Sequence, residues 1–495
     1  MRQDLIRKGW FPAFLFLLPI LLYAGCTTGV IPATGEKRYL GYSWEQEVNL
    51  GRKASKEVAA AFGLYRDPGL ERYVEEVGRR VLARSHLRRP ETDPEIRNTP
   101  VTFQILDSPV INAMALPGGH IYVTRGMLAH LNSEDQLASV LAHEIGHVSA
   151  RHASRQAWQQ QLGQGLLLGG ALIGQIVGLP AEQILNLGGA AAQLIFLRYS
   201  REDELEADRL GVEYTSLAGY DPTAVTGLFE SLDRMQEKEG QGLPNFLSTH
   251  PNPGDRIARI RQWSSGRRSE RPRDGRYFDA IDGMVLGEDP RHGFVERDVF
   301  YHPDLRFRFP VPRGFRVVNQ PAQVIMVEGA RRAILGFASS PEKSPEAAAA
   351  RFARQGGLRV LDNRRARSNG LPAVALLADA KMQNGRVARL LAYFVEFGGN
   401  VYHFVGYTSP EAFGAFRGVF LRTMEGFGEL RDPAMLSRQP VRLATLRVSR
   451  PARFRALIPR GAPGEMTPED LAILNQVRLD QMIEPGTVLK FPRSF

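Results

Sequence analysis

The chain contains very little cysteine for its length. Cys26 is the only cysteine among 495 residues, so the sequence excludes a disulfide framework. Long hydrophobic runs near the N-terminus are also lacking, because the apolar stretch from Phe11 to Leu22 is shorter than the roughly 20 residues of a membrane-spanning helix. The length of the chain indicates more than one domain.

The sequence also lacks the pattern of a nucleic-acid-binding protein. The formal net charge is +10, but no basic helix with interleaved aromatic residues occurs. Many arginines lie in residues 261–276, where Ser, Gly and Pro are typical of a linker. We therefore expect no nucleic-acid partner, and attraction to anionic lipid surfaces is a more natural use of the charge.

The most informative motif is HEIGH at residues 143–147, which has the form HExxH. Residues four apart share one face of a helix, so His143 and His147 can bind one metal ion. Glu144 lies beside them, where its carboxylate can take a proton from metal-bound water. The motif predicts zinc-dependent hydrolysis of peptide bonds.

The residues before the motif favour a helix. Ser133 and Gln136 have the spacing of a capping box, and apolar residues from Leu137 to Val148 then recur at helical spacing. The motif should therefore lie in the middle of a helix with a buried side. The alternative is a surface helix that carries two incidental histidines.

A catalytic zinc ion needs three protein ligands and one open position. The acidic run at residues 202–208 offers Glu204 as the third ligand. Asp208 shares its helix face and is predicted to accept the free ring N–H of one histidine. Ala207 and Gly211 are small, so this helix can approach the first one closely. The alternative is a solvated acidic face.

These motifs together resemble the gluzincin peptidases that include HtpX and the periplasmic BepA-like proteases. The resemblance covers roughly residues 40–263 and rests on HExxH followed by Ser-Arg-x-x-Glu-x-Glu-Ala-Asp. It implies a zinc cofactor held by His143, His147 and Glu204. It also implies that Glu144 is the general base and that Asp208 orients a ligand.

Two further segments fit this family. Residues 111–123 contain a Pro-Gly-Gly turn between two strand-like runs, and in similar peptidases the first strand is an exposed edge that pairs with substrate. Asn112 and Ala113 are the predicted substrate contacts, while an ordinary supporting hairpin is the alternative. His120 is expected to be structural because it falls in the strand.

A second segment, Thr249-His250-Pro251, lies in a loop rich in Pro and Gly. In related proteins this histidine approaches the metal, either as a fourth ligand in a closed state or as a helper for the oxyanion. A fourth protein ligand would occupy the water position. The alternative is a loop histidine that is held by turn hydrogen bonds.

The N-terminus predicts export. Basic residues precede the apolar segment, and Leu22-Tyr23-Ala24-Gly25-Cys26 resembles a bacterial lipobox, so residues 1–25 are the predicted signal peptide. Cys26 would be lipidated, and the threonine that follows it favours the outer membrane by the same resemblance. The alternative is simple secretion after cleavage near Ala24 or Gly25.

The predicted fold class is α+β. Residues 26–265 form a mainly helical zincin peptidase domain with a small edge sheet, and residues 266–276 form a linker. Residues 277–437 are predicted to form an α+β domain with an antiparallel sheet, similar to PsbP-like folds. Residues 442–492 resemble a LysM module without its usual Gly-Asp-Thr opening. Two roles are therefore left open for them, peptidoglycan binding and packing against the peptidase.

These predictions describe a zinc endopeptidase that is lipid-anchored in the bacterial periplasm. Its expected substrates are misfolded or unassembled envelope proteins. A second hypothesis is a zinc-stabilised chaperone or adaptor with a latent peptidase, which would bind envelope proteins or peptidoglycan.

Overall fold

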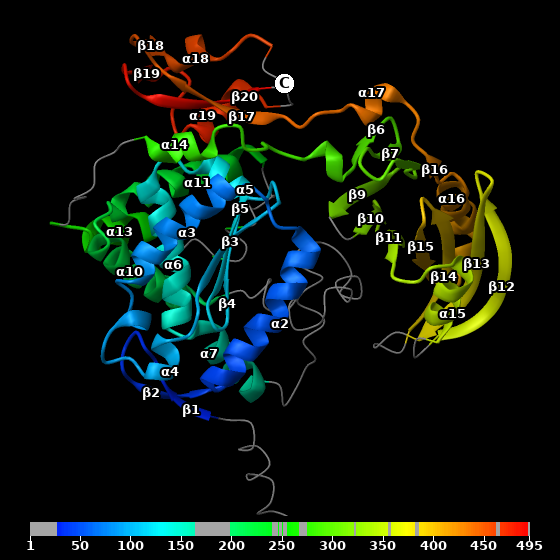
Figure 1. Ribbon diagram of the computed structural model, residues 1–495, viewed down its shortest axis with the longest axis horizontal. Helices are drawn as coiled ribbons and strands as arrows, with labels where there is room; N and C mark the ends of the chain where they lie inside the picture. The colour runs from blue at the N-terminus through cyan, green and yellow to red at the C-terminus, as the bar shows by residue number, and fades with distance from the viewer. Residues whose placement is uncertain are drawn as a thin grey trace, which may run out of the picture.

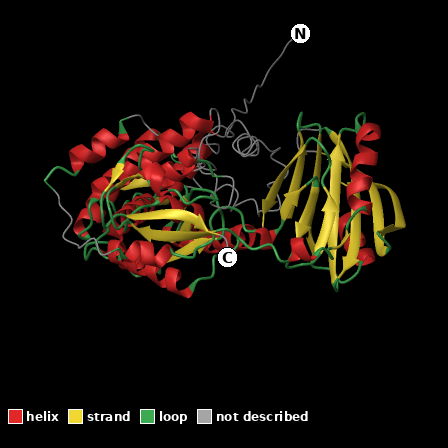
Figure 2. Cartoon of the chain, turned by 90° about the horizontal axis from the view of Figure 1, so that it is seen from above, coloured by secondary structure: helices red, strands yellow, loops and turns green. Residues whose placement is uncertain are grey.

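The computed structural model describes residues 27–163, 199–239, 246, 250, 255–266, 275–320, 323–354, 358–381, 386–461 and 466–493. A helix-rich region (blue to green in Figure 1) is followed by a strand-rich region (green through yellow to light orange), and the C-terminal segment (orange to red) lies over the helix-rich region. Figure 2 shows the helix-rich and strand-rich regions side by side. The predicted order of a helical region with a small sheet and then an antiparallel-sheet region is confirmed.

Several helices of the first region begin after residues whose side chains cap them. Ser43 forms a capping box with Gln46, and Asp67 and Ser133 accept first-turn N–H groups that would otherwise be unpaired. The helices are α2 (Trp44–Phe62), α3 (Pro68–Leu82), α4 (Pro94–Arg97), α5 (Arg125–His130), α6 (Glu134–Ser149), α7 (His152–Gly163), α10 (Arg201–Leu217), α11 (Val225–Glu239), α13 (Arg256–Trp263) and α14 (Arg276–Ile281), with 3-10 turns at His86–Arg88 and Pro222–Ala224.

The capping residue of α6 is the predicted one, but the box is not complete. Ser133 accepts the N–H of Gln136, whereas the Gln136 side chain accepts the N–H of Asn132 rather than that of Ser133. The second helix begins at Arg201 with Ser200 as its N-cap. The largely apolar residues from Ala190 to Leu197 that precede it lie outside the described residues.

Small residues bring α6 and α10 close together, as predicted. A Cβ atom at Gly146 would lie 3.1 Å from the carbonyl oxygen of Ala207, and one at Gly211 would lie 3.4 Å from the Cα atom of His143. Larger side chains at these two positions would push the helices apart. The close contact places the acidic face of α10 against the two histidines of α6.

A three-stranded sheet lies beside α6. Its order is β3-β5-β4, with β3 (Thr102–Leu106) parallel and β4 (Ala113–Leu116) antiparallel to the central strand β5 (His120–Thr124). The Pro-Gly-Gly turn joins β4 and β5, and Gly118 adopts a φ of 74°, which favours glycine. A separate hairpin is formed by β1 (Thr27–Val30) and β2 (Lys37–Leu40).

The strand-rich region contains a seven-stranded antiparallel sheet between two helices. Alternation along β13 directs Ala373 and Ala375 to the core beside α16, and Val374 and Leu376 to the core beside α15. The sheet order is β12-β13-β14-β15-β11-β10-β9, and β16-β8-β7-β6 form a second sheet. The elements are β6 (Phe294–Glu296), β7 (Val299–His302), β8 (Phe307–Pro310), β9 (Phe315–Gln320), β10 (Gln323–Glu328), β11 (Ala333–Ser340), α15 (Pro345–Ala353), β12 (Leu358–Ser368), β13 (Leu371–Lys381), β14 (Val387–Phe397), β15 (Asn400–Thr408), α16 (Phe413–Glu425), β16 (Gly428–Glu429) and α17 (Pro433–Leu436), with a 3-10 turn at Pro290–His292.

The C-terminal segment returns to the helix-rich region. Leu443 and Leu474 are fully buried in the hydrophobic core of that region, and the buried Lys490 ammonium donates to the carbonyl oxygens of Ala129 and Leu131 at the end of α5. The elements are β17 (Arg442–Arg447), β18 (Ala452–Arg453), α18 (Phe454–Leu457), α19 (Pro468–Leu474), β19 (Met482–Ile483) and β20 (Val488–Arg493), with β17 paired to β20. The strand-rich region is thus inserted between two parts that pack together.

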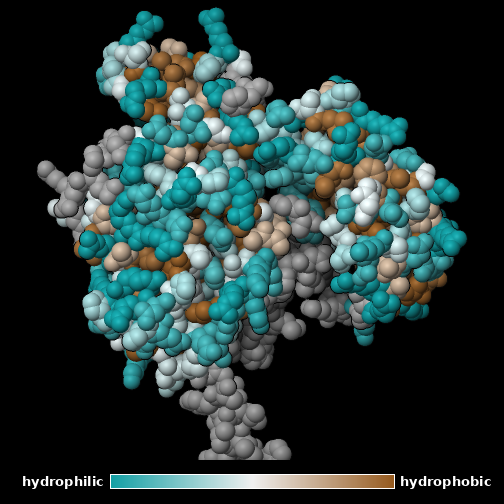
Figure 3. Space-filling model, in the orientation of Figure 1, coloured by the Kyte–Doolittle hydropathy of each residue, from teal (hydrophilic) through white to brown (hydrophobic). Residues whose placement is uncertain are grey.

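Among the helices of the described residues, none combines the length and apolar character that a membrane span requires. The face of the molecule in Figure 3 is mostly hydrophilic, with hydrophobic side chains in small groups. Such scattered groups are normal on a folded protein surface.

Candidate metal centre

The two histidines of HEIGH lie on one face of α6 and are almost completely buried. His143 is 6% exposed and His147 is 2% exposed. Their Nε2 atoms lie 3.0 Å apart. Helical spacing accounts for this pairing, since residues four apart occupy neighbouring positions on the same face.

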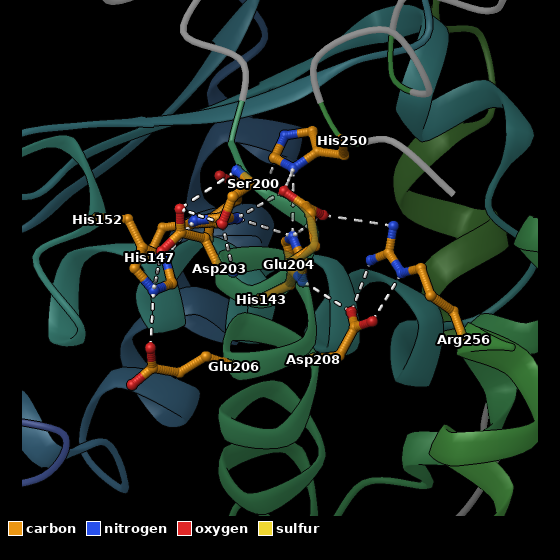
Figure 4. Close-up of polar contacts among 11 residues, drawn as sticks. His143, His147, His152, Ser200, Asp203, Glu204, Glu206, Asp208, His250 and Arg256 are labelled. Carbon is orange, nitrogen blue, oxygen red and sulfur yellow. Dashed lines mark hydrogen bonds and ion pairs between the residues drawn. The ribbon is translucent and has the colours of Figure 1, made fainter. Parts of the chain in front are cut away.

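Glu204 reaches the same point from α10. Its Oε2 atom lies 3.6 Å from His143 Nε2, and its Oε1 atom lies 3.5 Å from His147 Nε2. The carboxylate is fully buried. Figure 4 shows the three side chains converging from the two helices.

His250 completes the cluster from a residue far along the chain. Its Nδ1 atom lies 3.0 Å from Glu204 Oε1 and 3.3 Å from His143 Nε2. The ring is buried and stacks on Phe246, with centroids 4.8 Å apart. The sequence left the position of His250 open, and the structure places it against the predicted ligands.

The donor set fits a zinc ion. Four ligand atoms, one each from His143, His147, Glu204 and His250, lie within 4.8 Å of one another. Zn–N and Zn–O bonds of about 2.0–2.2 Å in a tetrahedron separate the ligand atoms by about 3.3–3.6 Å, which is close to the observed 3.0–3.6 Å. In addition, Glu204 Oε2 is buried without a hydrogen-bond partner. Buried orphan acceptors are costly unless a cation satisfies them.

Glu144 lies at the cluster but outside the set of ligands. Both of its carboxylate oxygens are buried without hydrogen-bond partners, and Oε1 lies 3.7 Å from His250 Nε2. Burial raises the pKa of the Glu144 carboxyl, and the positive charge of nearby histidines only partly opposes this shift. A buried carboxyl without hydrogen-bond partners next to a metal site is suited to accept and return a proton.

Asp208 contacts the outer nitrogen of His143. The Oδ1 atom of Asp208 lies 3.0 Å from His143 Nδ1, so it can accept the N–H that remains when Nε2 faces a metal. Arg256 donates to both Asp208 oxygens at 2.6 and 2.7 Å, and its Nη1 atom lies 3.4 Å from Glu204 Oε2. Burial favours the neutral acid, but the Arg256 charge and the hydrogen bonds from His143 and Arg256 together outweigh it and hold the pKa of Asp208 well below its usual range.

Residues 68–264, which include this cluster, match the model of peptidase family M48. These residues form an M48 peptidase domain. The sequence-based prediction of a gluzincin-type metallopeptidase is therefore confirmed at the level of the family. The predicted roles of individual site residues stay predictions.

Several known proteins are similar to this chain over part of its length. It is 30% identical over 236 residues to the beta-barrel assembly-enhancing protease of Yersinia pestis, covering 47% of this chain and 46% of the relative. It is 31% identical over 237 residues to the mitochondrial metalloendopeptidase OMA1 of Schizosaccharomyces pombe, covering 47% of this chain and 65% of the relative. The chain thus spans about half to two thirds of the length of these relatives.

Part of the chain has a weaker similarity to solved structures. The solution structure of cyanobacterial PsbP from Synechocystis aligns with 26% of this chain and 91% of its own, at 15% identity and a TM-score of 0.22. This score is too low to assign a fold to the region. The similarity to PsbP-like folds therefore stays a prediction.

The edge strand of the M48 domain differs from the prediction. β4 is at the edge of its sheet, but Asn112, Ala113 and the rest of the strand are buried rather than exposed. β4 packs against α2 and α6, and Asn112 pairs with Thr124 through its backbone. A substrate strand could pair with β4 only after the edge is uncovered.

His120 bonds to Thr102 and lies away from the cluster, as expected of a structural residue.

Of the glutamates in the acidic run of α10, Glu204 is the one that belongs to the metal cluster. Glu202 is exposed, and Glu206 pairs with Arg155 and His152. Cys26, the predicted lipidation site, and the predicted signal peptide lie outside the described residues.

Sequence reasoning missed His152 and Tyr199. His152 Nδ1 lies 2.8 Å from His147 Nδ1, and the Tyr199 ring stacks on the His147 ring with centroids 4.0 Å apart. Both residues are buried. A histidine five residues after the motif was a local signal for the first contact, whereas Tyr199 carried no signal in the sequence.

Proposed function

We propose that this protein is a zinc-dependent endopeptidase of the bacterial cell envelope. The observation that carries the proposal is the convergence of His143, His147 and Glu204 on one buried point beside the unpaired Glu144 carboxylate. Two nitrogen ligands and one carboxylate are a set that catalytic zinc sites use, with a fourth position left for water or substrate.

Each residue has a role in this proposal. A bound zinc ion supplies Lewis acidity, which makes water acidic enough to lose a proton near neutral pH and polarises a carbonyl group. Glu144 takes a proton from the attacking water and then returns it to the leaving nitrogen. Asp208 and Arg256 keep the outer N–H of His143 bonded, so that Nε2 faces the metal.

The test of this proposal is the Glu144→Gln substitution. The amide fills nearly the same space but cannot accept the proton, so we expect zinc content and thermal stability like those of the unsubstituted protein and a loss of cleavage of an unfolded substrate. Glu202→Gln, on the exposed side of α10, is the matched control and should keep full activity. Cleavage of the same substrate by purified Glu144→Gln protein would refute the role of Glu144.

His250 is proposed as a fourth ligand in a closed, inactive state. The support is the position of its Nδ1 atom, 3.0 Å from Glu204 and 3.3 Å from His143, where water or a carbonyl would otherwise bind. The His250→Ala variant should bind zinc and change basal cleavage, rising if His250 blocks the site and falling if it assists the oxyanion. Unchanged basal and substrate-stimulated activity would leave His250 with a structural role only.

The proposed substrates are misfolded or unassembled envelope proteins. The support is the similarity of the M48 domain to bacterial beta-barrel assembly-enhancing proteases. Pull-down from isolated envelopes with Glu144→Gln as a trap would identify captured substrates. Recovery of the same proteins with a Glu144→Gln/His147→Ala form, which should lack the metal, would count against capture at the active site.

The proposed location is the periplasm, with a lipid anchor at the outer membrane. The signal-like segment and Cys26 support it, and mass spectrometry of the mature N-terminus tests it. A diacylated Cys26 would support the anchor, and a free N-terminus near residue 25 would support simple secretion.

A second candidate function is a chaperone or adaptor with a latent peptidase. The position of His250 within the ligand set favours it, because a fully ligated metal has no open position for water. Peptidoglycan binding by residues 442–492 belongs to this alternative. Absence of cleavage by both the unsubstituted protein and the His250→Ala variant, with zinc bound, would favour this function.

A further inference from the structure

The two histidines of the metal cluster have different neighbours behind their rings. His143 contacts a carboxylate directly, because Asp208 Oδ1 lies 3.0 Å from its Nδ1 atom. His147 contacts another histidine, with His152 Nδ1 at 2.8 Å from His147 Nδ1. Both rings of this second pair are buried, so neither nitrogen has bulk water as its partner.

Proton counting fixes the direction of the His147–His152 hydrogen bond. If His147 Nε2 is a metal ligand, the proton of the neutral ring is on Nδ1, which must donate. His152 Nδ1 must then be the acceptor, so the proton of His152 is on Nε2. That atom lies 3.3 Å from Glu206 Oε2, which can accept its N–H, and 3.5 Å from Asp203 Oδ1.

The carboxylates behind His152 have their own counter-charge. Arg155 Nη1 donates to Glu206 Oε2 at 2.6 Å, and Arg155 Nη2 lies 3.5 Å from Asp203 Oδ1. His152, Asp203 and Glu206 could by geometry hold a metal themselves. The guanidinium already supplies a positive charge there, which makes a relay of hydrogen bonds the better account of these three residues.

The turn after α6 holds His152 in place. Arg151 has a φ of 54°, in the left-handed region that non-glycine residues rarely adopt, and α7 starts at the next residue. The Arg151 side chain is buried and donates to Glu47 of α2 at 2.6 and 2.8 Å. This buried contact links α2 to the turn that brings His152 back alongside His147.

The ring of His147 is also held from its face. Tyr199 stacks on it with an interplanar angle of 22° and a centroid distance of 4.0 Å. A planar neighbour limits tilting of the imidazole, and the His152 nitrogen limits rotation within its plane. Together they leave one orientation, in which His147 Nε2 faces His143 Nε2 and Glu204.

We propose that His152 is a positioning residue for the metal site. Its Nδ1 atom accepts the N–H of His147, and its Nε2 atom donates to Glu206, which in turn is bonded to Arg155. Each histidine ligand would then be oriented by a chain of hydrogen bonds, His143–Asp208–Arg256 for one and His147–His152–Glu206–Arg155 for the other. This inference rests on the proposed zinc site. Losing a partner of this kind typically lowers metal affinity by about 10- to 100-fold.

The test measures zinc affinity rather than activity alone. The His152→Ala variant should raise the zinc dissociation constant by about 10- to 100-fold in competition with a chromophoric chelator. Co²⁺ in place of zinc should show an altered visible spectrum, because the orientation of one ligand changes. His152→Asn should restore most of the affinity, since its Oδ1 atom can accept the His147 N–H.

Two further variants distinguish loss of the hydrogen-bond chain from misfolding of the protein. Glu206→Gln leaves no cavity and should weaken zinc binding in the same direction but less. His130→Ala removes a partly buried histidine, which bonds to the Gly126 carbonyl outside the site, and should leave the zinc dissociation constant unchanged. Circular dichroism of each metal-free variant reports its folding.

The outcomes separate the two proposals. Zinc binding by the unsubstituted protein with equal affinity in a folded His152→Ala variant would overturn the positioning role alone. An equal loss in His152→Ala and a folded His152→Asn variant would also count against it, as would an unchanged affinity in Glu206→Gln. Failure of the unsubstituted protein to bind zinc at all would instead refute the proposed metallopeptidase site.

Discussion

Arg256 holds Asp208 by two hydrogen bonds, from Nε to Oδ2 at 2.7 Å and from Nη2 to Oδ1 at 2.6 Å. Both side chains are almost fully buried, and the guanidinium also lies over the Phe229 ring at 4.6 Å. The pair links α13 to α10 directly behind His143. Arg256, near the end of the M48 domain, therefore helps to hold the histidine that the HEIGH motif contributes to the metal cluster.

The first prediction concerns this pair. Arg256→Met should lower the free energy of unfolding by about 3–5 kcal/mol, because it leaves the Asp208 charge buried without its partner. Arg256→Lys should cost less, but a single ammonium cannot bond both carboxylate oxygens as the planar guanidinium does. Urea unfolding followed by tryptophan fluorescence measures the effect, since all four tryptophans lie within residues 10–263.

Arg259→Met is the control for that experiment. Arg259 lies on the same helix, but it and its partner Asp255 are about half exposed, so the substitution should change stability by no more than about 0.5 kcal/mol. A urea midpoint for Arg256→Met equal to that of Arg259→Met would show that the buried pair does not stabilise the domain.

The second prediction concerns the contact between α2 and the β4–β5 turn. A Cβ atom at Gly51 would lie 1.8 Å from the carbonyl oxygen of Pro117. Alanine is normally better than glycine within a helix by about 1 kcal/mol, yet Gly51→Ala should destabilise the domain by about 1–3 kcal/mol because the turn must move. Lys53→Ala, at an exposed position of α2, should be nearly neutral. A more stable Gly51→Ala protein in thermal unfolding would contradict the contact.

The third prediction tests whether the C-terminal segment is part of the core of the M48 domain. Leu474 is fully buried in that core although it follows the strand-rich region in the sequence. Leu474→Ala should lower the stability seen by tryptophan fluorescence by about 2–5 kcal/mol. Leu446→Ala is the matched control, since Leu446 is 44% exposed. An unchanged fluorescence transition for Leu474→Ala would mean that the segment folds independently.

The fourth prediction is a pH dependence at His130. Burial lowers the pKa of His130 to about 4, and the ammonium of Lys490 acts in the same direction, while the hydrogen bond to the Gly126 carbonyl opposes them. The unfolded chain binds a proton near pH 6.5 and the folded chain only near pH 4. The contribution of His130 to the free energy of unfolding is therefore fully present above about pH 6.5. It decreases as the pH falls toward 4, by up to about 3 kcal/mol.

His130→Asn should reduce the slope of stability against pH between 6.5 and 4 in urea unfolding monitored by tryptophan fluorescence. His302 and His403 have pKa values that burial likewise lowers to about 4, but they lie in the strand-rich region, which contains no tryptophan. An unchanged slope in His130→Asn would show that His130 stays accessible to protons in the folded protein.

Local sequence patterns predicted the elements of the metal cluster well. The N-cap at Ser133, the mid-helix position of HEIGH and the register of Glu204 all follow from helical spacing and capping, which act between residues a few positions apart. The antiparallel sheet of the inserted region was predicted from similar local patterns. β12 carries no such pattern, since it is exposed along nearly its whole length and rich in arginine.

By itself, the sequence determined which helices form, which side chains share a face and which residue types can bind a metal, because these depend on short-range geometry. Only the tertiary structure decided that His250 and Arg256 reach the cluster, that His152 contacts His147 and that β4 is buried. It also decided that the C-terminal segment packs on the M48 domain. These contacts join segments whose meeting depends on turns and on the packing of the whole core, which local propensity does not encode.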